Sequence, residues 1–169
     1  EWQAPPEDTK DSDRKMLRGI VHDGNARALN GISGHAGLFS TASDVGIFCA
    51  MMLRNGASND GQRILSPLTL ATIRKDHANL PGDEIERGLG WDIDSPYNSQ
   101  KGNLFAGGYG HTGFTGTSIW IEPEEKIAVI IMANRVHPDG KGDVVGLRAR
   151  VANIVAGSIK KSYKNYQPK

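Results

Sequence analysis

The chain has 169 residues, 38% hydrophobic and 23% charged, so it is long enough to bury a core and does not have the composition of a disordered protein. Its net charge of +1 gives no electrostatic reason to expect nucleic acid or an anionic membrane as a partner, and no stretch is apolar enough to span a bilayer. Cys49 is the single cysteine, which excludes an internal disulfide and leaves the redox compartment open.

The first 87 residues divide into two parts. Residues 1–15 are charged and contain proline, which predicts an exposed lead-in, and residues 16–87 form a loop and helical region. The first residue is not Met and no signal-like apolar segment follows it, so we expect the sequence to begin within a longer or processed protein. Thr41 with Asp44 three residues later predicts the start of a helix that ends at Asn55-Gly56. Ser66-Pro67 predicts the start of a second helix.

Beyond residue 88 the pattern is typical of strands. Gly88–Ile93 and the segment around His111 each predict one. Ser118–Glu122 and Lys126–Asn134 flank Pro123-Glu124-Glu125, which predicts a hairpin. The second strand of this hairpin is apolar without alternation, so we expect both of its faces to be covered.

A last helix is predicted from about Val144 to Lys160. Its expected apolar side consists of Val144, Leu147, Val151, Ile154, Val155 and Ile159. Residues 88–161 are therefore expected to hold antiparallel strands and a C-terminal helix, followed by a basic tail at 162–169. Helices followed by an antiparallel hairpin and a covering helix predict an α+β fold.

The segment Gly107–Ser118 carries the strongest candidate site. Its dense glycines let a backbone approach a ligand closely, and His111, Thr112 and nearby hydroxyls supply polar groups at the same surface. Acyl-transfer enzymes need such groups beside the scissile carbonyl, with backbone N–H donors where the oxyanion develops. The alternative is a glycine-rich hairpin whose histidine is merely exposed to solvent.

Several segments together, from about Leu17 to Ile159, resemble the serine β-lactamase and penicillin-binding-protein superfamily. The similarity is to its class C, D,D-peptidase and esterase branch, and to the C-terminal portion only. The segments that carry it, in chain order, are Val21–Ala26 (with Gly24 where Glu is frequent), Gly34–Thr41, Gly88–Trp91, Gly110–Gly116 and Val129–Pro138.

The resemblance implies acyl-enzyme hydrolysis of an amide or ester bond in a small molecule or peptide, with no cofactor and no metal. It gives His111 a catalytic role, polarising a tyrosine and orienting an anionic substrate, and makes the Phe114 backbone N–H an oxyanion donor. Thr112, Gly113 and Thr115 would contact the substrate. Histidine in place of lysine favours a D,D-peptidase, D-aminopeptidase or esterase over a dedicated β-lactamase, and the family suggests a bacterial, periplasmic or secreted protein.

The nucleophile of that family, a Ser-x-x-Lys motif at the start of a buried helix, is not found in a suitable place. Ser12–Lys15, Ser158–Lys161 and Tyr163–Asn165 match motifs by letters alone, in polar or misordered positions. We therefore expect this chain to be inactive by itself and to need an N-terminal portion of the same protein. The alternative is a non-catalytic fragment or binding module that folds alone or completes a second polypeptide.

Four further polar residues could form a site of their own. Ser33 is interpreted as a turn serine, because its surroundings do not form a nucleophile elbow. His22, Asp23 and His35 could be considered as metal ligands, but they lack a recognised ligand spacing.

Overall fold

A five-stranded antiparallel sheet forms the centre of the molecule. The computed structural model describes residues 2–3, 17–78, 85–95 and 98–160. The sheet order follows the chain order: β3 (Glu86–Arg87), β4 (Asp92–Asp94), β5 (Tyr109–Thr112), β6 (Ser118–Glu122) and β7 (Ile127–Ile131). A separate pair consists of β1 (Trp2–Gln3) and β2 (Leu17–Arg18). The predicted β6–β7 hairpin is confirmed, and β6 has the predicted bounds.

The start of the sheet differs from the sequence prediction. Residues 88–91 were expected to be extended, but the Gly88 N–H donates to the Trp91 carbonyl (2.9 Å) and Gly90 has a φ of +78°. These two features make a turn, so β4 begins only at Asp92. The unpredicted strand β3 lies on the other side of this turn.

Four helices accompany the sheet: α1 (Gly24–Ala28), α2 (Ala42–Leu53), α3 (Pro67–Ile73) and α4 (Val145–Gly157). The helix starts predicted at Thr41 and Ser66 are confirmed, because these side chains accept hydrogen bonds from the backbone amides of Asp44 and Thr69. Helix α1 was not predicted, although Asp23 caps it by accepting the Ala26 N–H at 2.7 Å. No helix in the described part of the chain is both long and apolar enough to cross a bilayer.

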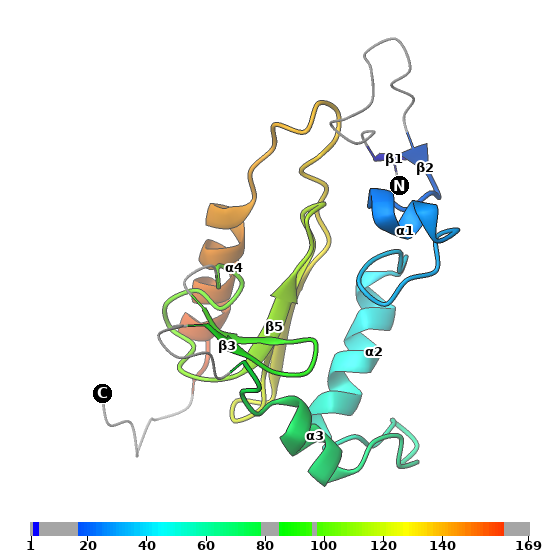
Figure 1. The fold of residues 1–169 in the computed structure, drawn as a ribbon. Coiled ribbons are helices and arrows are strands. Elements are labelled where there is room, and N and C mark those ends of the chain that lie inside the picture. Colours follow the sequence, from blue (N-terminus) through cyan, green and yellow to red (C-terminus); the bar gives the residue numbers. More distant parts are fainter. Residues whose placement is uncertain (1, 4–16, 79–84, 96–97, 161–169) are drawn as a thin grey trace.

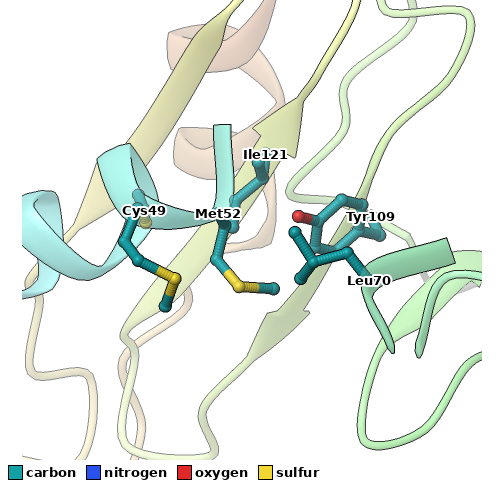
Figure 2. Packing of buried hydrophobic residues seen from close by; sticks show 6 residues of the cluster. Cys49, Met52, Leu70, Tyr109 and Ile121 are labelled. Atoms are coloured by element: carbon teal, nitrogen blue, oxygen red, sulfur yellow. The ribbon is translucent and has the colours of Figure 1, made fainter. Parts of the chain in front are cut away.

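Helices α2 and α4 lie on opposite faces of the sheet (Figure 1). On the α2 side, Met52 of α2 and Leu70 of α3 meet Tyr109 and Ile121 of the sheet (Figure 2). On the α4 side, Trp120 packs with Phe105, Val129, Ala152 and Ala156. Alternate residues of β7 belong to the two clusters. Ala128 and Ile130 pack in the cluster on the α2 side, and Ile127 and Val129 pack in the cluster on the α4 side. Both faces of this strand are therefore covered, as predicted, and the architecture is α+β.

The apolar side predicted for α4 is partly wrong. Leu147 and Ile154 are 40% and 68% exposed, whereas Arg148, Ala152 and Ala156 are buried. Alanines let the helix approach the sheet closely, and this approach sets the rotation of the helix about its axis. The arginine is tolerated there because its guanidinium reaches two backbone carbonyls.

A carboxylate at the end of β6 is also buried. The Glu122 side chain is 4% exposed, and its Oε2 has no hydrogen-bond partner among the described residues. Burial raises the pKa of Glu122, and the like charges of Glu124 and Glu125 add to this effect. The nearby backbone amides of Glu124 and Gly107 offset part of the increase.

We expect the variant Glu122→Gln to gain thermal stability relative to the native chain as the pH rises. A carboxyl with a raised pKa in the folded state binds its proton more tightly there than in the unfolded chain. Its stabilising contribution is complete below the ordinary value of 4.5 and is lost as the pH rises through the folded-state pKa. Melting temperatures of both proteins from roughly pH 4 to pH 8 check this. A difference that does not change with pH would contradict it.

Candidate active site

The predicted glycine-rich strand is β5, and His111 lies exposed near its C-terminal end. The imidazole makes two contacts, from Nδ1 to the Thr112 carbonyl oxygen (2.8 Å) and from Nε2 to Nη1 of Arg87 (3.3 Å). Since a guanidinium only donates and a carbonyl only accepts, these contacts assign the proton to Nδ1 and a lone pair to Nε2. His111 is thus a neutral imidazole beside a permanent positive charge.

Arg87 was not among the residues singled out from the sequence. It lies on β3, separated from β5 by β4, and its side chain reaches across to His111. The position of Arg87 near His111 follows from the register in which β3 pairs with β4, which the sequence does not reveal. Arg87 therefore places a permanent positive charge beside the histidine.

Thr112 and Gly113 lead into a tight turn over residues 113–117. The Gly113 N–H donates to the Thr117 carbonyl (2.8 Å), and the Gly116 N–H donates to the Gly113 carbonyl (3.0 Å). Any side chain at Gly113 would collide with Oγ1 of Thr117, and Gly116 has a φ of +126° with the Ala133 carbonyl oxygen close by. Glycine is therefore required at Gly116 to form the turn, whereas a side chain at Gly113 would force the Thr117 side chain to move.

Phe114 projects from the turn with 63% of its surface exposed. Its carbonyl oxygen accepts a hydrogen bond from Nε of Arg135 (2.8 Å), and the same guanidinium lies over its ring at 4.4 Å. On the other side the ring stacks against His22 at 5.6 Å. Within the described part of the chain, the Phe114 N–H has no protein acceptor. The residue is anchored by its carbonyl and ring while its amide is left available.

Two arginines hold this turn by hydrogen bonds to its backbone carbonyls, and neither was singled out from the sequence as a functional residue. Nη2 of the buried Arg148 donates to the Gly113 and Thr117 carbonyls, each at 3.0 Å. Burial lowers the pKa of Arg148, and the neighbouring charge of Arg135 lowers it further. Thr115 is placed by its backbone, since its carbonyl accepts the Arg135 N–H at 2.7 Å. The turn is thus held by two arginines that lie outside the histidine-threonine-glycine segment.

The loop that carries His22 contains a hydrogen-bonded chain of three side chains. Oγ of Ser33 lies 2.5 Å from Nδ1 of His35, and Nε2 of His35 lies 2.9 Å from Oδ1 of Asp23. The Ala26 amide and His35 lower the pKa of Asp23. The same Asp23 oxygen caps α1, so the chain fastens the loop to this helix. No group of three or more described histidines, cysteines or carboxylates is arranged to hold a metal ion.

The remaining candidate motifs lie elsewhere. Ser12–Lys15 and Tyr163–Asn165 lie outside the described residues. Ser158 follows the last residue of α4, and its Oγ donates to the Ile154 carbonyl at 2.7 Å. A serine at the end of a helix does not have the position of the family's nucleophile, which begins one.

An antiparallel sheet between helices, with a histidine-threonine-glycine segment at the end of its middle strand β5, matches the architecture of serine β-lactamases and penicillin-binding proteins. The sequence model of the β-lactamase family matches residues 2–153, so the chain belongs to this family. Two annotated relatives are "putative D-alanyl-D-alanine carboxypeptidases" of Salmonella gallinarum and Salmonella agona. They are 35% and 34% identical to it over 127 residues, which make up 72% of this chain and 28% of each relative.

A solved structure supports the same fold. A β-lactamase from Mycobacterium bovis superposes with a TM-score of 0.53 and 22% identity, over 72% of this chain and 46% of that protein. The chain therefore spans less than a third of the length of the carboxypeptidase relatives and about half that of the structural neighbour.

Proposed function

We propose that the complete protein is a serine hydrolase that cleaves an amide or ester bond through an acyl-enzyme. The observation that carries this proposal is the Phe114 amide, which is left without a protein acceptor beside the exposed end of β5. A preorganised N–H at this position can stabilise the oxyanion of a tetrahedral intermediate. Membership of the β-lactamase family supports the reaction type. The nucleophilic serine is proposed to lie in a part of the protein outside these 169 residues.

The substrate is proposed to carry a carboxylate. Arg87 supplies a fixed positive charge next to His111, and Thr112 follows at the end of the strand. A guanidinium and a hydroxyl are suitable partners for a carboxylate. The neutral His111 can accept a proton or a hydrogen bond at Nε2 once a bound substrate draws Arg87 away. Gly113 and Thr115 complete the edge along which the substrate would lie.

The names of the relatives favour a peptide ending in D-alanine as the natural substrate class. A terminal carboxylate beside the scissile bond fits the charge at Arg87. Such a substrate belongs to bacterial cell-wall chemistry, so a periplasmic or secreted location accompanies this proposal.

This proposal predicts that the 169-residue chain alone forms no acyl-enzyme, whereas the complete protein does. Both proteins are incubated with a fluorescent penicillin or a fluorophosphonate, followed by denaturing electrophoresis and peptide mapping. We expect stoichiometric label on a serine outside this chain and none within it.

Ser33 is the residue that could contradict this expectation, because it is hydrogen-bonded to His35 and thence to Asp23. Label on Ser33 or Ser12 would show that the nucleophile had been placed wrongly. The matched variant Ser33→Ala should leave labelling of the complete protein unchanged. A complete protein that takes up neither probe would refute the proposed function.

A further inference from the structure

A cavity of about 420 Å³ lies at the far end of the sheet from the Gly113–Thr117 turn. It is bounded by residues 103–107, by the β6–β7 hairpin and by the end of α4. Ser118 of β6 pairs with Thr112 beside the candidate active site, whereas Glu122 at the opposite end of β6 lines the cavity. Four residues of extended strand separate the two by roughly 13 Å. The cavity is therefore distinct from the candidate active site.

The walls of the cavity combine an apolar surface with carboxylates. Leu104, Phe105, Ala156 and Ile159 form the apolar part. Among the described residues that line it, the ionisable ones are Glu122, Glu124 and Glu125, and all three are acidic. An apolar cavity with a few convergent polar groups is typical of a small-molecule site.

One oxygen of the Glu122 carboxylate, which lines this cavity, lacks a hydrogen-bond partner among the described residues. The residue is 96% buried, and Oε2 has no hydrogen-bond partner in the described structure. The backbone amides of Glu124 and Gly107 stabilise part of the carboxylate charge, but a buried oxygen without a partner is costly, and native proteins pair or neutralise such groups. The nearest lining carboxylates repel it instead of pairing with it. A ligand that brings a positive charge to Oε2 would satisfy it.

The carboxylates do not form a metal site. Among the described residues, no three histidines, cysteines or acids are arranged as ligands. Divalent cations with oxygen ligands need several oxygens around one point, whereas a single ammonium or guanidinium is satisfied by one carboxylate. The apolar walls also favour a cation that carries hydrocarbon over a hydrated ion.

We propose that this cavity binds a small organic cation, an ammonium or guanidinium group on a short apolar body, with Glu122 as its counter-ion. The charged head lies at Oε2 of Glu122, and the body lies against Leu104, Phe105 and Ile159. Because the cavity lies at the opposite end of the sheet from the Gly113–Thr117 turn, its occupancy does not depend on whether the complete protein is a hydrolase.

The test uses hexylammonium and its neutral counterpart hexan-1-ol, titrated into this chain and followed by amide shifts in NMR spectra. We expect saturable binding of hexylammonium, with a dissociation constant on the order of 1 mM or lower. The amides that shift should be those of residues 104–107, Glu122 and Gly157. Hexan-1-ol should bind at least about tenfold more weakly, because it cannot form the charge-assisted contact.

The variant Glu122→Gln should bind hexylammonium roughly tenfold or more weakly, whereas Glu86→Gln, on exposed β3, should bind it as the native chain does. Equal affinity for hexan-1-ol and hexylammonium would overturn the proposal, as would undiminished binding by Glu122→Gln. Shifts centred on residues 111–114, or no saturable binding, would overturn it too. The comparison of the two ligands in the native chain decides the matter even if Glu122→Gln does not fold.

Discussion

Replacing Ile121 by Asp is expected to destabilise the fold by about 4 kcal/mol or more. Ile121 is a fully buried residue of β6, in the cluster between the sheet and α2 (Figure 2). A carboxylate there would be neither solvated nor paired, since the surrounding cluster is apolar apart from the Tyr109 hydroxyl and the Cys49 thiol. This cost is comparable to the whole stability of many domains, so the variant should be largely unfolded at room temperature.

The matched control is Ile32→Asp, the same chemical change at a position that is 85% exposed. It should shift the free energy of unfolding by no more than about 0.5 kcal/mol. Urea unfolding followed by circular dichroism measures both variants against the native chain. A cooperative transition of Ile121→Asp near the native midpoint would mean that this position of β6 is not part of the buried core.

The parts of the fold that could be predicted from the sequence are those with local causes. Thr41 and Ser66 predict the starts of α2 and α3, because each side chain caps its helix by accepting a hydrogen bond from the amide three positions later. The β6–β7 hairpin is predicted from Pro123, which lies between two apolar segments. By contrast, α1 is five residues long, too short to show an apolar period, and its Asp23 cap was not interpreted as one.

What could not be predicted depends on contacts between distant segments. Arg87 is 24 positions from His111 in sequence, and Arg148 is 35 positions from Gly113. Neither belongs to a motif, and a cation on a short strand or within a helix is ordinarily interpreted as a solvated surface residue. The rotation of α4 about its axis, which buries Arg148 and exposes Ile154, is set by packing of alanines against the sheet.

The candidate site shows the same division. The histidine-threonine-glycine segment was located from its sequence, and the strand predicted around it is β5, which lies in the middle of the sheet between β4 and β6 and not at its edge. The sequence does not reveal the tautomer of His111, because this tautomer follows from the Arg87 guanidinium that donates to Nε2. Nor does it show that Arg135 anchors Phe114 by its carbonyl and its ring. The charge and rigidity of this site come from arginines that lie outside the motif.

Changing His111 to Ala in the complete protein is expected to lower kcat/KM on an ester or peptide substrate by roughly a hundredfold to a thousandfold. The imidazole lies at the end of β5, where it holds Arg87 and where the substrate edge begins. Its loss removes a positioned polar group and frees the guanidinium to move, and both changes weaken stabilisation of the transition state. The fold should be unaffected, since His111 is exposed and lies outside both core clusters.

His137→Ala is the matched control, because His137 is also exposed but lies beyond β7, outside the proposed substrate edge. We expect its kcat/KM to equal that of the native protein, and both variants to keep the native melting temperature. If His111 were only a solvent-exposed hairpin residue, its removal would change stability by no more than about 0.5 kcal/mol and leave the kinetics unaltered. Equal kcat/KM values for native protein and His111→Ala would therefore remove the catalytic role of the residue and, with it, the assignment of Arg87 and Thr112 to substrate binding.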